Sequence, residues 1–234
     1  MKLTHRLFIV GALLCFAWFL QPQYANSAKV ILLARSGIGT YSYAGSGQFS
    51  GSGNIATYTI NIGTATSTRY IVVGLQANGT AAYTMTAAGT SLNSDVLLAP
   101  GGNNTSQIFS GLVTSGSGSQ SIVATCDSCT FQARTVFVWV ITSLNTNAVK
   151  HTASSQSGSS MSINVTAGDF LFTTRNQNPV TFNGSTEAPF ENLTGSGSTI
   201  SGADWTIIST NAAFSVTASS VYTAPNPGTS ASYN

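Results

Sequence analysis

The chain has 234 residues, of which 42% are hydrophobic and only 6% are charged, with glycine, serine, threonine and asparagine where charges usually stand. The apolar share is enough to bury a core, which argues against a disordered chain. Without the leader at residues 1–28, six basic and six acidic residues remain, so the near-neutral mature chain has no basic surface and nucleic acid is excluded as a partner.

Residues 1–28 have the features of a helical secretory signal peptide. Lys2 and Arg6 give a positive start, residues 7–20 form an uncharged apolar core, and residues 25–28 are small enough for cleavage. The core is shorter than the roughly 20 residues of a membrane span. We expect cleavage, with a retained signal anchor as the alternative. The mature chain is then secreted, extracellular or periplasmic, in an oxidising compartment and without a membrane segment.

The remaining chain is a series of short runs rich in β-branched and aromatic residues, separated by turn-forming residues. No window has helical periodicity. Residues 134–142 are apolar on both faces, as is typical of a central strand. The pattern predicts an all-β fold, an antiparallel β-sandwich of jelly-roll-like type or a barrel. The predicted strands are 29–34, 54–62, 69–77, 81–87, 94–99, 106–113, 120–125, 134–142, 160–166, 169–175, 203–210 and 212–219.

The predicted sandwich covers residues 29–222 as one domain. The alternative is two packed sandwiches that divide near residues 143–160. Residues 36–54 are rich in glycine and serine and are expected to be flexible. Residues 223–234 are polar and contain two prolines, which predicts a flexible C-terminal tail or attachment arm.

Several segments, in order, resemble a family of β-sandwich proteins from tail and virion gene clusters of bacteriophages and prophages. "IGTATSTRYIVVGL" (62–75) is similar to the family's early GTA-xx-R-x-VVV signature, and "RTVFVWVITSL" (134–144) is similar to a later strand. The other similar segments are "GLVTSGSGSQSIVAT" (111–125), "SINVTAGDFLFTT" (162–174), "VTFNGSTE" (180–187) and "SGADWTI" (201–207).

The resemblance spans about residues 55–219 and implies a jelly-roll-like sandwich with a structural or surface-binding role. It brings no catalytic residues. Virion proteins assemble in the cytoplasm and normally lack a secretory leader, so the leader indicates a host-encoded or repurposed secreted relative. The protein is expected in a virion only if it is phage-encoded.

Cys126 and Cys129 are the only cysteines after the leader. A thioredoxin-type pair requires a helix N-terminus, which these strand-like flanks do not supply. A structural zinc site requires further cysteine or histidine ligands, and only His151 remains. We therefore expect a disulfide that closes a tight loop, with free thiols or a redox or metal site as alternatives.

Other candidate chemistry is sparse. His151 lies near serines but no GxSxG elbow is present, and Glu187 and Glu191 lie in an expected loop rather than across a cleft. Asp95 and Asp169 are candidate calcium ligands without an EF-hand pattern, so turn capping is the simpler interpretation. We expect no catalytic residues, no metal and no cofactor.

The candidate ligand-binding residues are aromatic. Tyr41, Tyr43 and Phe49 lie in an expected glycine- and serine-rich loop, where rings could stack on sugars, and Trp205 follows Asp204 in a predicted strand. The predicted function is an exported, non-enzymatic β-sandwich that contacts copies of itself or other surface or virion proteins. A secreted carbohydrate-binding module is the alternative, and a hydrolase that uses His151 or Glu187 is a third hypothesis.

Overall fold

The computed structural model describes residues 39–52, 54–78, 81–99, 104–127, 134–142, 149–155, 160–175, 182–183, 191–194, 201–207, 211–218 and 228–233. All of them belong to one compact unit, Ile38–Asn234. The predicted signal peptide and the strand expected at 29–34 lie outside the described residues and stay predictions. No helix in the described part has the length and apolarity to cross a membrane.

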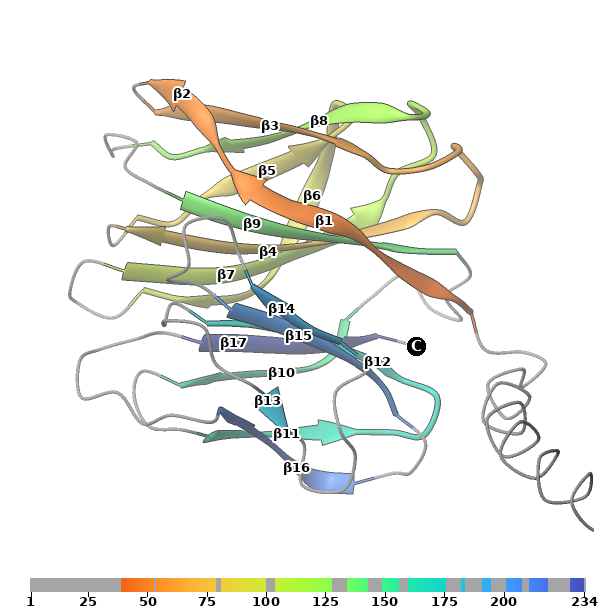
Figure 1. Cartoon of the computed structure of the whole chain (residues 1–234), viewed down its shortest axis with the longest axis vertical. Coiled ribbons are helices and arrows are strands. Elements are labelled where there is room, and N and C mark those ends of the chain that lie inside the picture. Colours follow the sequence, from red (N-terminus) through yellow and green to blue (C-terminus); the bar gives the residue numbers. More distant parts are fainter. Residues whose placement is uncertain are drawn as a thin grey trace, which may run out of the picture. The chain divides into compact units, whose positions relative to one another are not determined.

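The described residues form antiparallel strands and no helix, which confirms the all-β prediction (Figure 1). The strands are β1 (Tyr41–Gln48), β2 (Ser50–Ser52), β3 (Ile55–Asn61), β4 (Tyr70–Asn78), β5 (Thr84–Ala87), β6 (Thr90–Leu98), β7 (Asn104–Leu112), β8 (Ser119–Thr125), β9 (Arg134–Ile141), β10 (Val149–Ser155), β11 (Ser160–Val165), β12 (Phe170–Arg175), β13 (Phe182–Asn183), β14 (Glu191–Thr194), β15 (Ser201–Thr206), β16 (Asn211–Ala218) and β17 (Gly228–Tyr233).

Two segments expected to be flexible are strands instead. Residues 41–48 and 50–52 form β1 and β2, so the loop expected at 36–54 is wrong for these residues. Residues 228–233 form β17, which pairs with β10 on one side and β12 on the other, so the expected flexible tail at 223–234 is wrong for this part. Both segments are rich in small polar residues, and pairing with neighbouring strands compensates for their weak local propensity: β1 pairs with β9, β2 pairs with β3, and β17 lies between β10 and β12.

The strands form three sheets, ordered β1-β9-β4-β7-β6-β5-β8-β3-β2, β10-β17-β12-β15-β14 and β11-β16-β13. In the nine-stranded sheet, β6 pairs with β5 through its first residues and with β7 through the rest, with a register shift between Ser94 and Val96. The sheet therefore folds over at β6, and its two halves enclose an apolar core that includes Ile71, Val138 and Ile122.

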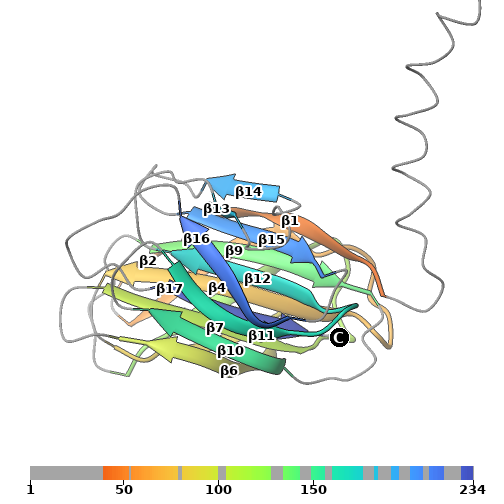
Figure 2. The same cartoon turned by 90° about the horizontal axis from the view of Figure 1, so that it is seen from below.

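A second apolar cluster, here named the central seam, lies between the β9-β4-β7 part of the large sheet and the five-stranded sheet (Figures 1 and 2). Its buried members are Tyr70, Val72, Ile108, Phe137, Trp139, Ile141, Phe170, Phe172, Ala231 and Tyr233. A third cluster, which includes Leu171, Trp205 and Phe214, lies between the five-stranded and three-stranded sheets.

Strand β9 confirms the central position expected from its composition. Val136, Val138 and Val140 point into the core of the large sheet, whereas Phe137 and Trp139 point into the central seam. Successive side chains alternate between the faces of a strand, so a strand with apolar covers on both sides must be apolar throughout.

Candidate functional site

The aromatic side chains gather at the central seam, where the two large sheets meet. Trp139 of β9 packs on Phe172 of β12 with a ring-centre distance of 5.0 Å, and Phe172 packs on Tyr233 of β17 at 5.7 Å. Tyr41 of β1 lies edge-on to Phe170 at 5.0 Å and to Phe172 at 5.3 Å. Such pairs contribute about 0.5–1.5 kcal/mol beyond their burial, so the rings help to join the sheets.

A fully buried carboxylate crosses this seam. Asp204 of β15 accepts a hydrogen bond from Trp139 Nε1 at 2.8 Å and one from the Tyr41 hydroxyl at 2.9 Å. Its chain neighbours Ala203 and Trp205 point the other way, into the third cluster. Strand alternation thus aims Asp204 at the opposite sheet, where each carboxylate oxygen has a donor.

A polar group lies at another place between the same sheets. Gln76 Nε2 of β4 donates to Thr174 Oγ1 of β12 at 2.7 Å and to Ser106 Oγ of β7 at 2.5 Å. Ser106 in turn shares a 2.8 Å hydrogen bond with Thr229 of β17. All four side chains are buried, and the Gln76 carbonyl oxygen finds no partner among the described residues. The group fixes how the sheets align, because buried polar groups that lose their partners are costly.

A third contact joins Tyr233 to Asp95, whose carboxylate accepts from the Tyr233 hydroxyl at 2.6 Å. Burial raises the pKa of the Asp95 carboxyl, although hydrogen bonds from Ser110 and Tyr233 oppose the shift. Burial also raises the pKa of the Tyr233 phenol well above its usual value, and the nearby Asp95 charge adds to the rise. Tyr70 lies beside Tyr233 in the seam, and burial raises the pKa of its phenol too.

The predicted ligand-binding aromatics do not form one site. Tyr41 and Tyr43 are partly buried on β1 and pack against the central seam. Phe49 packs against the core of the large sheet, beside Tyr58 at 6.4 Å. Trp205 is fully buried in the third cluster and offers no ring face to solvent. The four residues therefore belong to three different apolar clusters.

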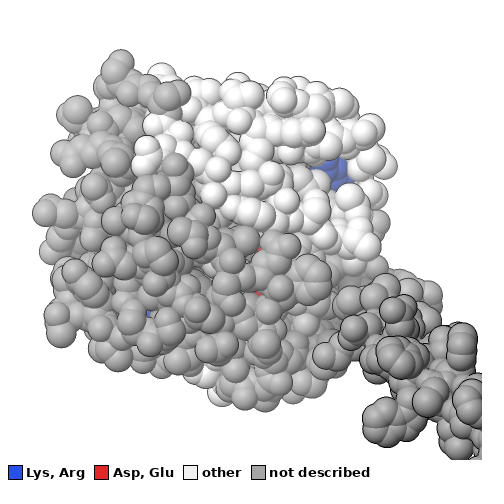
Figure 3. All heavy atoms as spheres, viewed as in Figure 1, with Lys and Arg blue, Asp and Glu red and all other residues white. Residues whose placement is uncertain are grey.

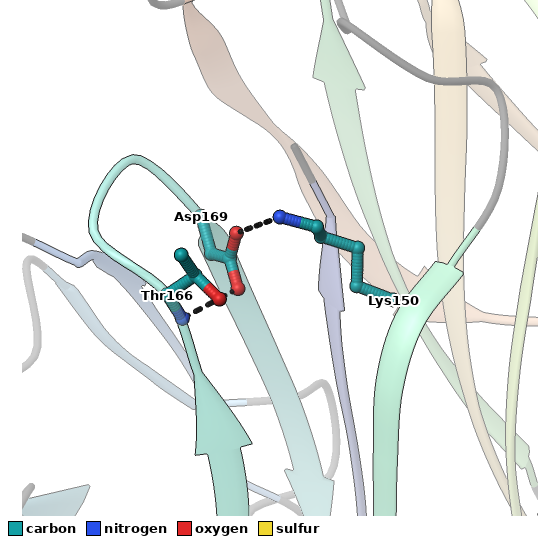
Figure 4. A network of polar contacts seen from close by, with 3 residues as sticks. All are labelled: Lys150, Thr166 and Asp169. Carbon is teal, nitrogen blue, oxygen red and sulfur yellow. Dashed lines mark hydrogen bonds and ion pairs between the residues drawn. The ribbon is translucent and has the colours of Figure 1, made fainter. Parts of the chain in front are cut away.

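The candidate calcium ligand Asp169 is buried and caps a turn (Figure 4). Its Oδ2 accepts from the Thr166 backbone N–H at 2.9 Å, and its Oδ1 lies 3.2 Å from Lys150 Nζ. Asp95 is held elsewhere, by Tyr233. Within the described ranges, no three histidine, cysteine, aspartate or glutamate side chains group as metal ligands would.

Among the described residues, those considered for catalysis do not lie together in one site. His151 lies in β10 and is partly buried. Glu191 starts β14, and Glu187 lies outside the described residues. Cys126 is buried, whereas Cys129 lies outside the described residues, so the disulfide between them stays a prediction.

Arg69 has a structural role that sequence reasoning missed. Its buried side chain donates from Nε to the Val113 carbonyl at 3.0 Å and from Nη1 to the Gly63 carbonyl at 3.2 Å. A further bond from Nη2 reaches the Ser115 carbonyl. The signal was present, because Arg69 is the only charged residue between Arg35 and Asp95. It is also the arginine of the GTATSTR segment (63–69), and here it ties the loops before β4 and after β7.

The described surface is poor in charge. On the face shown in Figure 3, the described atoms are almost entirely those of neutral residues. On β3 and β8 the outward positions include the exposed pairs Thr59–Ser121 and Asn61–Ser119. This arrangement can support contact with another surface, but it brings no nucleophile and base together.

Comparisons with known proteins give no relative from which to transfer a role: no family model matches the chain, and no curated protein matches its sequence.

Proposed function

We propose that the mature chain is an exported, non-enzymatic β-sandwich protein that acts by surface contact, as a component of a cell surface or, if phage-encoded, of a virion. The observation that carries the proposal is that three of its acidic side chains are hydrogen-bonded inside the protein. Asp95, Asp169 and Asp204 are each bonded to internal partners that hold the strands or sheets in place. Glycoside hydrolysis by carboxylates requires two of them across one cleft, and these three face separate partners.

The strand order supports a jelly-roll sandwich. Strands β1, β9, β4 and β7 lie on one side of the core of the large sheet, and β3, β8 and β5 lie on the other. Two antiparallel layers that close over a single core are typical of β-sandwiches, the class to which jelly rolls belong. The resemblance of residues 55–219 to phage and prophage sandwich proteins is consistent with this fold and with a structural role.

The outer face of β3 and β8 is the surface we propose for contact. Thr59 and Asn61 of β3 lie beside Ser121 and Ser119 of β8, and all four are exposed and uncharged. A partner that covers this face removes water from no charged group, which avoids the largest desolvation cost of association. A second copy of the chain is the simplest such partner.

The first measurement is the intact mass of the exported protein. We expect loss of residues 1–28 and a mass lower by two hydrogens, from the Cys126–Cys129 disulfide.

Sedimentation velocity then compares wild type with a Thr59→Lys and Ser121→Lys double variant. Association should weaken in the double variant and persist in a control with Thr114→Lys, which adds a charge at an exposed position outside these strands.

Three results would count against the proposal. A protein that stays monomeric and binds no cell surface would remove the contact role. A hydrolytic activity that His151→Ala abolishes would make the protein an enzyme. Binding on a glycan array that Tyr43→Ala abolishes would favour the carbohydrate-binding alternative instead.

A further inference from the structure

Strands β10–β17 repeat the pairing pattern of β1–β9. The five-stranded order β10-β17-β12-β15-β14 matches β1-β9-β4-β7-β6, and the three-stranded order β11-β16-β13 matches β3-β8-β5. Corresponding strands also occur in the same order along the chain, with β2 as the one insertion. Every pairing described in the second set has an antiparallel counterpart in the first.

The correspondence extends to register. Tyr70, at the start of β4, pairs with Ile141 in β9, and Phe170, at the start of β12, pairs with Tyr233 in β17. Tyr70 thus corresponds to Phe170, and along the two strands Gly74 corresponds to Thr174. The first strand of each set also carries a register shift near its start, in β1 after Tyr43 and in β10 after Val149.

The turns that precede β4 and β12 are built alike. Arg69 N–H bonds to the Thr66 carbonyl at 3.4 Å, and Asp169 N–H bonds to the Thr166 carbonyl at 2.9 Å. Each turn therefore spans the same number of residues and ends with a buried charged side chain.

These turns are also tied to the same neighbouring strand. The N–H of Val113, just after β7, donates to the Arg69 carbonyl at 2.9 Å, and the N–H of Ile207, just after β15, donates to the Asp169 carbonyl at 2.8 Å. The strands β7 and β15 correspond, so the two bonds are equivalent.

Equivalent residues face equivalent environments. Ile71 and Leu171 each point into the core of their own set of strands. Tyr70 and Phe170 each point into the central seam. The side chains, and not only the backbone, follow one plan in both sets.

Several contacts across the seam are reciprocal. Strand β9 meets β15 through the bond from Trp139 to Asp204, and β17, the counterpart of β9, meets β7, the counterpart of β15, through Thr229 and Ser106. Strands β4 and β12, which correspond to each other, also meet directly. Reciprocal contacts of this kind are the signature of a twofold interface between two copies of one subunit.

We infer that residues 39–142 and 149–233 are two self-contained copies of one β module, docked through the same sheet as an internal dimer. Each copy has its own core, and every described strand pairing stays within one copy. The partner that the seam fits is therefore a second copy of the module. This favours two packed sandwiches over the single domain expected from the sequence, and it does not rest on the proposed function.

The test cuts the connection between the copies in the full chain. A protease recognition sequence is inserted between Thr142 and Val149, the folded protein is cleaved, and its halves are followed by native mass spectrometry and circular dichroism. We expect the cleaved halves to stay associated with an unchanged β-sheet spectrum. Loss of the β-sheet spectrum on cleavage would overturn the inference, because neither half would be self-contained.

Two neighbouring residues of β12 provide a matched pair of variants. Phe172→Ala removes a ring from the seam and should weaken association of the cleaved halves at least about a hundredfold while both keep their β-sheet spectrum. Leu171→Ala removes a side chain from the core of the second copy and should lower its urea midpoint, with association changed less than about threefold. Equal loss of association in both variants would overturn the inference.

A milder variant keeps the test decisive if Phe172→Ala does not fold. Trp139→Phe retains a ring but removes the N–H that bonds to Asp204 across the seam. It should weaken association of the halves about tenfold, since one bond to a charged group is lost. Unchanged association in this variant would contradict the seam as the interface that joins the copies.

Discussion

Gly74 and Thr174 meet across the central seam, and the methyl group of Thr174 fills the space that a Cβ of Gly74 would occupy. Gly74 lies inside β4, where glycine is otherwise unfavourable because it has more backbone freedom to lose on folding. Its presence is therefore explained by the close approach of β12, and the contact can be tested directly.

We expect Gly74→Ala to reduce the free energy of unfolding by about 1–3 kcal/mol, the usual cost of overpacking. Thr174→Ser should restore part of this loss, because it removes the obstructing methyl group and keeps the hydroxyl that bonds to Gln76. Urea unfolding of wild type, both single variants and the double variant measures the coupling. Additive effects would show that the two residues do not meet.

Asp204→Asn should destabilise the protein by about 1–3 kcal/mol. The amide can accept from only one of the two donors, Trp139 or Tyr41, and the other donor is left facing an NH₂ group. Asp127→Asn is the matched control, since Asp127 is exposed and its neutralisation should change stability by less than about 0.5 kcal/mol. Equal stability of the two variants in thermal or urea unfolding would refute the bridging role of Asp204.

The Tyr233 phenol makes stability fall in alkaline solution. Its pKa is raised in the folded protein, so its contribution is fully present below the unfolded pKa of about 10 and is lost as the pH rises through the higher folded value. Tyr233→Phe should be less stable than wild type at pH 7, by about 1.5–3 kcal/mol, because it loses the bond to Asp95. The difference in urea midpoint should shrink above pH 10, and a constant difference would contradict the assignment.

Arg69→Lys should cost about 2 kcal/mol or more, although the charge is kept. The guanidinium donates to carbonyls of Val113, Gly63 and Ser115 at once, and a lysine ammonium cannot span them. Lys150→Gln serves as the comparison, because Lys150 is itself partly exposed and makes one ion pair, with the buried Asp169, whereas Arg69 is buried and bonds to three carbonyls. A smaller loss for Arg69→Lys than for Lys150→Gln would contradict this role.

Ala88→Asn should stabilise the protein by about 0.5–1 kcal/mol. Ala88 and Gly89 connect β5 to β6 with φ values of 48° and 78°, and positive φ at both central residues is the mark of a type I′ hairpin turn. Alanine is strained there, whereas asparagine tolerates this conformation. Thermal unfolding measures the gain, with Ala88→Val as the opposing control, which should destabilise because its branched side chain is poorly accommodated at positive φ.

Composition and alternation were enough to predict the all-β class and many of the strands, because in runs such as 54–62 and 134–142 the order of apolar and polar residues already indicates which faces are buried. The sequence pattern did not predict β1, β2, β10, β13, β14 or β17. The residues of β17 are mostly small and polar, and they become strand only because β10 and β12 bond to both of its edges.

Side-chain partners likewise depend on contacts that form only in the folded chain. Tyr41 and Trp205 look alike as candidate binding residues in the sequence, yet one bonds to Asp204 at the seam and the other is enclosed in a separate core. Packing between residues far apart in the chain sets these outcomes, and local sequence does not encode which distant strand will cover a given face.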